Sequence, residues 1–196
     1  GFIRLFGGQV TVGPFVTEEE IKALVTAGAE EAAIEEEEKE MIHSIFEFGD
    51  TIVREVMVPR TDMVAVEIKA SIQEVLNIII KEGHSRIPVY EESIDNVVGL
   101  VYAKDLLVHL NKAKNHVPPL KKIMRPAYYV PETKKVSDLL KEMQQKKMHM
   151  AIVLDEYGGT AGLVTIEDLL EEIVGEIFDE YDLEEAMIEV LSENQF

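Results

Sequence analysis

Cysteine is absent from the 196 residues of this chain. Its absence excludes disulfides, zinc–thiolate sites and cysteine nucleophiles, and it is typical of a reducing compartment. Basic residues are also few, because 19 Lys and Arg stand against 38 Asp and Glu and leave a net charge of -19. Nucleic acid is therefore excluded as a partner, since its binding needs clustered Lys and Arg. No run of 18 or more apolar residues occurs, so no bilayer-spanning helix is predicted.

The chain does contain enough apolar material for a folded core, because 46% of its residues are hydrophobic. Residues 1–50 are interpreted as a connector rather than a domain. Within it, Thr17 and Glu20 have the spacing of a capping box and predict the start of a helix. A second helix is predicted over 34–48, where apolar residues recur at helical spacing behind an acidic run.

From about residue 51 the sequence repeats itself, and the repeat is its most informative feature. The stretch 56–59, Val-Met-Val-Pro, is echoed by 123–126, Ile-Met-Arg-Pro. The stretch 99–107 matches 162–170 at six of nine positions. Both pairs of matches fall in the same order, so the chain is predicted to hold two copies of one structural unit.

The predicted domains are a first repeat at 51–113, a second repeat at 114–182 and a C-terminal linker at 183–196. Each repeat has the pattern strand, helix, strand, strand, helix, because short β-rich runs alternate with segments of helical periodicity. The predicted fold class is α/β (α+β), with the two repeats related by pseudo-twofold symmetry.

The first repeat shows its helix boundaries most clearly. Ser71 and Glu74 form a second capping-box pattern, and Gly83 ends the apolar stripe that follows. The run 87–90 is predicted to be a strand. Pro88 within it suggests an edge strand or the first residue of a strand, because proline lacks the N–H that a ladder needs.

Several motifs in the same order resemble the paired CBS (cystathionine-β-synthase) domains of CorC/HlyC proteins, which are linked to magnesium and cobalt efflux and hemolysin C, and of their animal cyclin M relatives. The resemblance covers about residues 17–182. It is carried by four stretches: Phe46–Asp50, Glu55–Asp62, His84–Tyr90 and Asp155–Thr160.

This resemblance implies a cytosolic regulatory module of a membrane divalent-cation (Mg²⁺ or Co²⁺) transporter. Family members place the CBS pair on the cytoplasmic side of the cell membrane, after a transmembrane domain. They bind an adenosine nucleotide with Mg²⁺, and they associate as a flat homodimer. A small C-terminal domain usually follows, so the chain is expected to be a piece of a longer protein.

The strand-to-helix turn at Thr165 and Asp168 is the strongest candidate for ligand contact. A helix N-terminus exposes unpaired amide groups, and a Thr hydroxyl with an Asp carboxylate three residues later suits the two hydroxyls of a ribose. The alternative is that these two residues only cap their own helix, since Thr-x-x-Asp approximates a capping box. The resemblance favours the sugar, because similar proteins use this Thr and Asp for it.

The two repeats are predicted to make two unequal clefts. In the family, each cleft takes its sugar-binding turn from one repeat and its phosphate-side basic residue from the other. One cleft then combines Arg86 with Thr165 and Asp168. The other would combine Met150 with Tyr102 and Asp105, and it lacks the guanidinium that can fork onto phosphate oxygens. One competent site per chain is therefore predicted.

Further contacts are predicted around this site. Adenine is expected against apolar walls, with Ser85 assisting a phosphate and Thr61 near the base. The predicted walls are Val58, Ile87 and Val164. Arg86 has an alternative role as a surface partner of Glu91 or Glu92.

No side-chain metal site is assigned. Mg²⁺ is expected to be held mainly by nucleotide phosphates and water. The acidic stretch 171–182 is interpreted as a solvated helix face, and the sequence leaves open whether it binds cations directly. The sequence leaves open whether ATP, ADP or AMP binds, and which cation the parent protein moves.

Two other function classes compete with a regulatory module. An enzyme such as a nucleotide hydrolase is disfavoured, because no Walker loop and no base–nucleophile pair occurs. A purely structural dimerisation module would leave the cleft empty or give it an AMP-type site.

Overall fold

The computed structural model describes residues 16–31, 33–108 and 118–175. Two helices, α1 (Glu18–Glu30) and α2 (Glu36–Phe48), precede the repeats. The first repeat contains α3 (Val53–Val56), β1 (Val58–Pro59), η1 (Arg60–Asp62), β2 (Val66–Glu67), α4 (Ile72–Glu82), β3 (Arg86–Glu91), β4 (Ser93–Tyr102) and α5 (Ala103–Leu107). The second contains η3 (Leu120–Lys122), β5 (Tyr129–Pro131), α6 (Val136–Lys146), β6 (Met150–Leu154), β7 (Thr160–Thr165) and α7 (Ile166–Val174).

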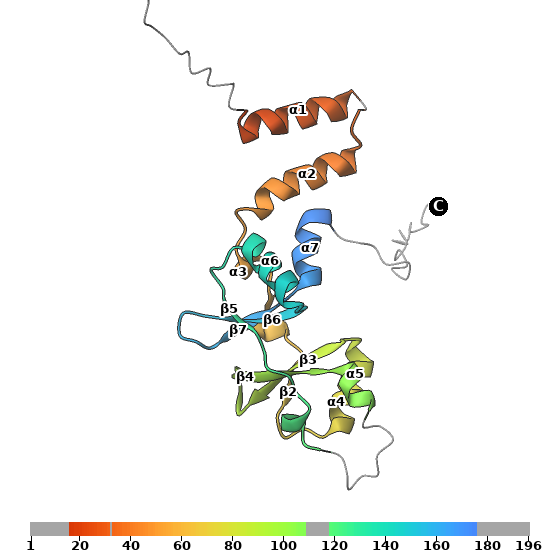
Figure 1. The fold of residues 1–196 in the computed structure, drawn as a ribbon, viewed down its shortest axis with the longest axis vertical. Coiled ribbons are helices and arrows are strands. Elements are labelled where there is room, and N and C mark those ends of the chain that lie inside the picture. Colours follow the sequence, from red (N-terminus) through yellow and green to blue (C-terminus); the bar gives the residue numbers. More distant parts are fainter. Residues whose placement is uncertain (1–15, 32, 109–117, 176–196) are drawn as a thin grey trace, which may run out of the picture.

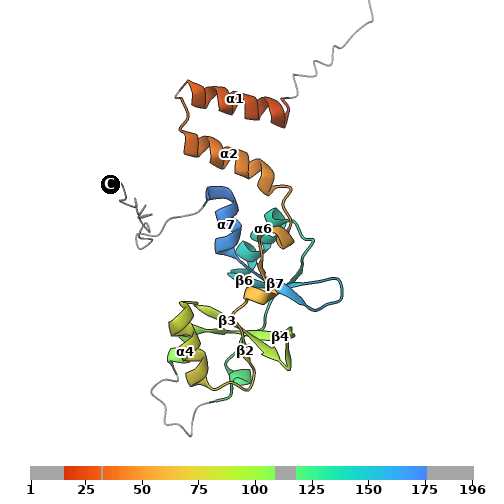
Figure 2. The same cartoon turned by 180° about the vertical axis from the view of Figure 1, so that it is seen from behind.

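The elements form three tiers along the long axis of the molecule (Figures 1 and 2). The α1–α2 pair lies at one end, the second repeat in the middle and the first repeat at the other end. Among the described residues, no helix is both long and apolar enough to cross a bilayer.

The predicted order of elements within each repeat is confirmed, and so are the helix boundaries marked by Thr17, Ser71 and Gly83, whereas the helix predicted over 34–48 begins at Glu36. Thr17 caps α1 and Ser71 caps α4, each in a reciprocal capping box with the Glu three residues later. Gly83 ends α4 with a φ of 75°, a left-handed conformation that costs glycine little because it has no Cβ. Local sequence chemistry therefore determined these ends.

Two sheets are present among the described residues, and each repeat pairs with part of the other. One sheet has the order β1-β7-β6-β5, so that β1 of the first repeat pairs antiparallel with β7 of the second. The other has the order β2-β3-β4, and Leu100 on β4 forms an antiparallel bridge to Arg125 of the second repeat. The start of each repeat is thus attached to the last strand of its neighbour.

Pro88 lies in a central strand, which differs from the prediction of an edge or a strand start. On the β4 side it pairs with Leu100, whose N–H and C=O both bond to Arg125 and so point away from β3. On the other side, β2 pairs only with Val89 and Tyr90. The missing N–H of Pro88 therefore costs no ladder bond, and the proline is tolerated.

Three apolar clusters hold the two repeats and their junction together. One lies in the first repeat around Val75 and Leu106, and one lies in the second around Leu139 and Leu169. The third lies between the sheets and includes both Leu100 and Leu163, the positions at which each repeat pairs with the start of the other. The junction is therefore a packed core rather than a loose contact.

The connector is attached to the second repeat, although it precedes the first in sequence. Phe48, at the end of α2, is buried in the core of the second repeat. Just after it, Val53 donates its N–H to the carbonyl of Lys134, and Val136 donates to that of Thr51. The position of the α1–α2 pair therefore depends on the position of the second repeat.

Replacing Gly162 by Ala tests the strand exchange, because a Cβ at this position would overlap the carbonyl oxygen of Val58 on β1. We expect Gly162→Ala to lower the free energy of unfolding by about 1–3 kcal/mol, the usual cost of overpacking. Urea denaturation measures the change.

The matched control is Gly28→Ala in α1, where the new Cβ would meet only the movable end of the Ile34 side chain, 2.9 Å away. That change is expected to leave stability unchanged or to raise it slightly, since Ala favours a helix. If Gly162→Ala proves as stable as the original protein, β1 does not lie this close to β7 in solution.

Candidate nucleotide site between the repeats

A cavity of about 400 Å³ lies between the two repeats. This volume falls in the usual range for small-molecule sites. The first repeat supplies Val58, Asp62, Met63, Val64, Gly83, His84, Ser85, Arg86 and Pro88, and the second supplies Met150, Leu163, Thr165, Glu167 and Asp168. Five of the eight residues predicted from sequence are among them: Val58, Ser85, Arg86, Thr165 and Asp168.

The Thr165–Asp168 turn joins β7 to α7 at the wall of this cavity. The backbone N–H of Thr165 donates to Oδ2 of Asp168 at 2.7 Å, and the N–H of Asp168 donates to the Thr165 hydroxyl at 3.2 Å. The capping role weighed from the sequence is therefore present. Capping does not use all the hydrogen-bonding capacity of the turn, because an ionised carboxylate has two oxygens and about four acceptor positions.

Arg86 begins β3 and reaches the cavity from the opposite repeat. Its side chain is 20% exposed, and its Nη1 lies 3.9 Å from Oε1 of Glu167 on α7. The structure shows this partner rather than the Glu91 or Glu92 considered from sequence. The Nε of Arg86 is buried and has no hydrogen-bond partner, so the guanidinium retains unused donor capacity at a site where an unpaired donor is costly.

Three residues predicted for the site do not line the cavity. Thr61 is exposed on η1. Ile87 and Val164 are fully buried in the cores of the first and second repeat. Strand geometry explains the last two, because successive side chains point to opposite faces. Their roles as base contacts stay predictions. Because their side chains are buried, only their backbone groups could contact a base.

The same alternation identifies lining residues that the sequence reasoning missed. Pro88 lies two positions from Arg86, and Leu163 lies two positions from Thr165, so each shares a strand face with a predicted residue. Glu167 lies inside the Thr-x-x-Asp motif itself. The alternation of side chains along β3 and β7 predicts that Pro88 and Leu163 line the cavity.

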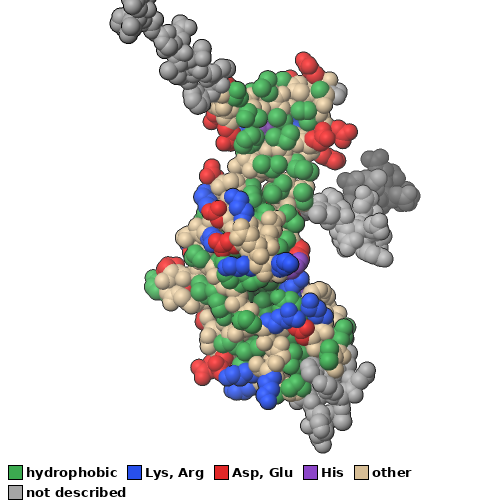
Figure 3. Space-filling view, viewed as in Figure 1, with side chains coloured by type: hydrophobic (Ala, Val, Ile, Leu, Met, Phe, Trp, Pro, Cys, Tyr) green, Lys and Arg blue, Asp and Glu red, His purple; other side chains and the backbone are tan. Residues whose placement is uncertain are grey.

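The charge around the cavity differs from that of the whole chain. Residues 51–175 contain 18 Asp and Glu against 16 Lys and Arg, a net charge of -2. In Figure 3 acidic side chains gather around α1 and α2, whereas Lys and Arg side chains gather over the repeats. An anionic ligand therefore meets much less repulsion at the repeats than a net charge of -19 suggests.

Comparison with known proteins identifies the family. The CBS domain model matches residues 53–112 and 120–175. A UPF0053 protein of Mycobacterium tuberculosis is 46% identical over 187 residues, which cover 94% of this chain and 43% of that protein. The magnesium and cobalt efflux protein CorC of Salmonella typhimurium is 40% identical over 185 residues, covering 94% of this chain and 63% of CorC.

The chain belongs to the CBS domain family and to its CorC/CNNM branch. The CBS domain of a bacterial CNNM/CorC family Mg²⁺ transporter superposes with a TM-score of 0.77 at 49% identity, covering 84% of this chain and all of that one. A structure of such a domain in complex with ATP has a TM-score of 0.68 at 51% identity, covering 71% of this chain and 99% of that one.

This CBS pair spans less than half of its Mycobacterium relative and about 63% of CorC. The predicted boundaries of its repeats remain predictions. The linker 183–196 and the end of the second repeat lie outside the described residues. Within the described part of the chain, no group of three or more His, Asp or Glu side chains is placed to hold a metal ion.

The second cleft of the CBS pair was predicted to combine Met150 with Tyr102 and Asp105. Met150 is 8% exposed and lines the first cavity as an apolar wall. Tyr102 ends β4, and Asp105 lies in the first turn of α5, as Thr165 and Asp168 do in the other repeat. Asp105 is bound by Arg125, a residue that the sequence reasoning did not assign to either cleft.

Proposed function

We propose that this CBS pair is a regulatory module that binds an adenosine nucleotide, ATP with Mg²⁺, and controls a membrane divalent-cation transporter. The observation that supports it best is one cavity that holds Arg86 of the first repeat and the Thr165–Asp168 turn of the second. A relative at 51% identity forms a complex with ATP, and a CBS pair from Klebsiella pneumoniae at 30% identity binds AMP.

In this proposal the two sides of the cavity divide the work of recognition. Asp168 and Thr165 accept hydrogen bonds from the ribose hydroxyls beside the N-terminus of α7. Arg86 and Ser85 hold the phosphates, and the guanidinium offers charge-assisted bonds. Val58 packs against the base, with the backbone of Ile87 and Val164 and the nearby Thr61 completing its surroundings.

Magnesium is part of this proposal because several carboxylates share the cavity with Arg86. Asp62, Glu167 and Asp168 all line it, and they would repel a bare triphosphate. Mg²⁺ prefers oxygen ligands and keeps several waters, so a phosphate-bound ion lowers this repulsion without a dedicated protein cage.

Control of a transporter needs a path from the cavity to the connector, and α7 provides one. Its first turn carries Asp168 at the cavity, and its Leu169 and Ile173 pack in the same core as Phe48 at the end of α2. A ligand that favours one position of α7 would also favour one position of the connector, provided that its affinity differs between the two states.

The proposed assembly is a homodimer on the cytoplasmic side of the membrane, attached to the transmembrane domain of the longer protein. What supports the homodimer is an apolar surface on α4 and α5, where Ile80, Leu107 and Val108 are each more than half exposed. Exposed apolar surfaces often mark protein contacts.

Thr165→Ile is expected to weaken ATP binding by more than about tenfold, because a branched apolar group removes the hydroxyl and fills the sugar position. Thr165→Ser is the matched control and should keep most of the affinity. Arg86→Ala should weaken ATP by about 10–100-fold but leave adenosine nearly unaffected, since adenosine has no phosphate. Isothermal titration calorimetry measures all three variants.

The oligomeric state of each variant, measured by light scattering, should be unchanged. If Thr165→Ile binds ATP as well as the original protein, the sugar assignment is wrong. If the original protein binds no adenosine nucleotide at all, the CBS pair acts only as a structural module.

ATP affinity is expected to rise when Mg²⁺ is added, because the ion screens the triphosphate from Asp62 and Glu167. Glu167→Gln should narrow the difference between affinities with and without Mg²⁺. Adenosine is the matched control ligand, and its affinity should not respond to the ion. Equal ATP affinity in the presence and absence of Mg²⁺ would contradict this role.

A regulatory module should also change shape when it binds its ligand. Small-angle X-ray scattering of the full chain is expected to differ with and without Mg²⁺-ATP, while Thr165→Ile should give the same curve in both conditions. Identical curves for the original protein at saturation would leave binding without a conformational response.

A further inference from the structure

Arg125 occupies the position in the second repeat that Val58 occupies in the first. Val58 pairs with Leu163 on β7, and Arg125 pairs with Leu100 on β4. The two leucines hold the same place in the repeats, each after a glycine that lets the partner backbone approach closely. Because Val58 lines the first cavity, pseudo-twofold symmetry predicts that the side chain of Arg125 lies at the second cleft expected from the sequence.

The guanidinium of Arg125 binds the carboxylate that corresponds to the proposed ribose acceptor. Its Nε donates to Oδ2 of Asp105 at 2.7 Å, and its Nη2 donates to Oδ1 at 2.8 Å. Both oxygens of Asp105 are therefore engaged by one forked donor. In the first cleft, by comparison, the hydrogen bond to Asp168 comes from the N–H of Thr165 through one oxygen.

Further contacts hold both the guanidinium and the backbone of Arg125 in place. The Cζ of Arg125 lies 4.5 Å from the centre of the Tyr102 ring, within the range of a cation–π contact. Tyr102 occupies the position in the first repeat that Thr165 occupies in the second. The backbone of Arg125 is fixed as well, because it exchanges hydrogen bonds of 2.8 and 2.9 Å with Leu100.

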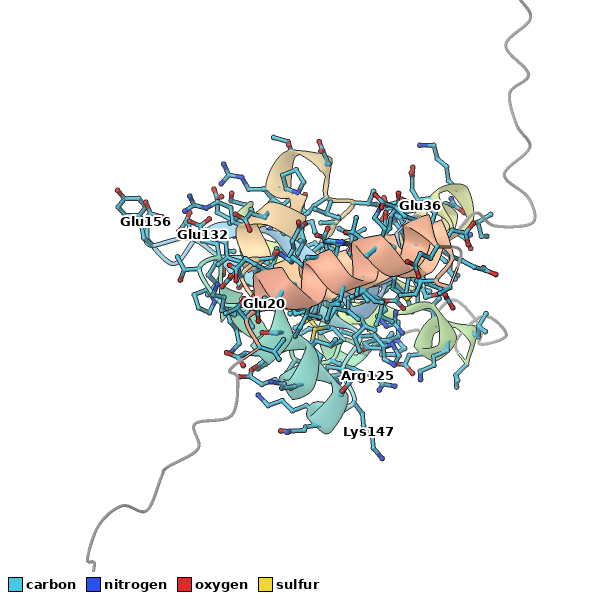
Figure 4. All side chains as sticks on the ribbon, turned by 90° about the horizontal axis from the view of Figure 1, so that it is seen from above. Glu20, Glu36, Arg125, Glu132, Lys147 and Glu156 are labelled. Atoms are coloured by element: carbon cyan, nitrogen blue, oxygen red, sulfur yellow. The ribbon has the colours of Figure 1, made fainter. Side chains whose placement is uncertain are left out.

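In the view down the long axis, Arg125 lies on the same side of the molecule as the end of α6, where Lys147 is labelled (Figure 4). Its side chain is 47% exposed and that of Asp105 is 26% exposed. A single exposed ion pair contributes little to stability. The forked geometry and the aromatic contact still matter for a competing ligand, because ribose hydroxyls are neutral and charge-assisted bonds are roughly twice as strong as neutral ones.

We infer that Arg125 is a built-in occupant of the second cleft, whose guanidinium holds Asp105 and excludes a nucleoside there, so that the CBS pair takes one nucleotide per chain. The inference rests on the proposed function of the first cleft. It adds a residue that determines which cleft binds, beyond the unsuitable Tyr102.

The test uses the full chain with Thr165→Ile, so that the first cleft does not contribute. Tyr102→Thr is added to restore the small hydroxyl in the second cleft, and Arg125→Val then gives that cleft the residue found at position 58. Adenosine is the ligand titrated, because it has no phosphate and so needs no guanidinium to hold one. Arg54→Val is the matched control, since Arg54 forms an exposed ion pair with Glu132 instead.

We expect the variant with all three substitutions to bind one adenosine per chain at least about tenfold more tightly than Thr165→Ile/Tyr102→Thr alone. A variant that carries Arg54→Val in place of Arg125→Val should bind adenosine no more tightly than Thr165→Ile/Tyr102→Thr. Circular dichroism and light scattering confirm that each variant is folded. The inference is overturned if adenosine binds equally well while Arg125 is present, or if the folded triple variant does not bind it.

A second measurement needs no ligand and so separates this inference from the proposed function. The guanidinium of Arg125, with a smaller contribution from Lys104, holds the pKa of Asp105 below its ordinary value. NMR titration of the Asp105 carboxyl should show its pKa rising in Arg125→Val and unchanged in Arg54→Val. An unchanged value in Arg125→Val would refute the ion pair even if the first cleft binds ATP as proposed.

Discussion

The close approach of β1 to β7 is the contact on which the rest of this structure depends. Gly162 has no side chain, and the carbonyl of Val58 lies where a Cβ would be. The antiparallel pairing that results joins the start of the first repeat to the last strand of the second. Without this exchange the two repeats would bury separate cores, and no cavity would have walls from both.

The pairing between repeats occurs twice, at Val58 with Leu163 and at Arg125 with Leu100, and the two copies have diverged in the side chains that they carry there. At one, a valine leaves room beside the Thr165–Asp168 turn. At the other, an arginine from the same register reaches the matching aspartate. Duplication supplies two equivalent scaffolds, and the differences of Arg125 from Val58 and of Tyr102 from Thr165 make them chemically different.

The helix α7 serves two roles because both of its ends lie at junctions. Its N-terminus places the Thr165–Asp168 capping box at the cavity. Further along, it packs with Phe48 and thereby with the connector. Burial raises the pKa of Glu172 on this helix, with the nearby carboxylates of Glu171 and Glu55 adding to the effect. Because Phe48 packs with Leu169 and Ile173, the acidic connector and the nearly neutral repeats meet along this helix.

The sequence by itself determined the repeat, the order of its elements and the ends of several helices. These features depend on interactions between neighbours in the chain, such as the Thr17–Glu20 and Ser71–Glu74 capping boxes and the left-handed Gly83. The family resemblance added the crosswise grouping of Arg86 with Thr165 and Asp168, and these three residues do line one cavity.

Tertiary structure alone decided which faces of the strands meet the cavity and which side chains meet across the repeats. Ile87 and Val164 are apolar and adjacent to site residues, yet they are buried in the cores because neighbouring strand positions face opposite ways. The ion pair of Arg125 with Asp105 spans 20 residues and depends on the exchanged strand. Contacts between distant segments depend on packing geometry, which local sequence patterns do not specify.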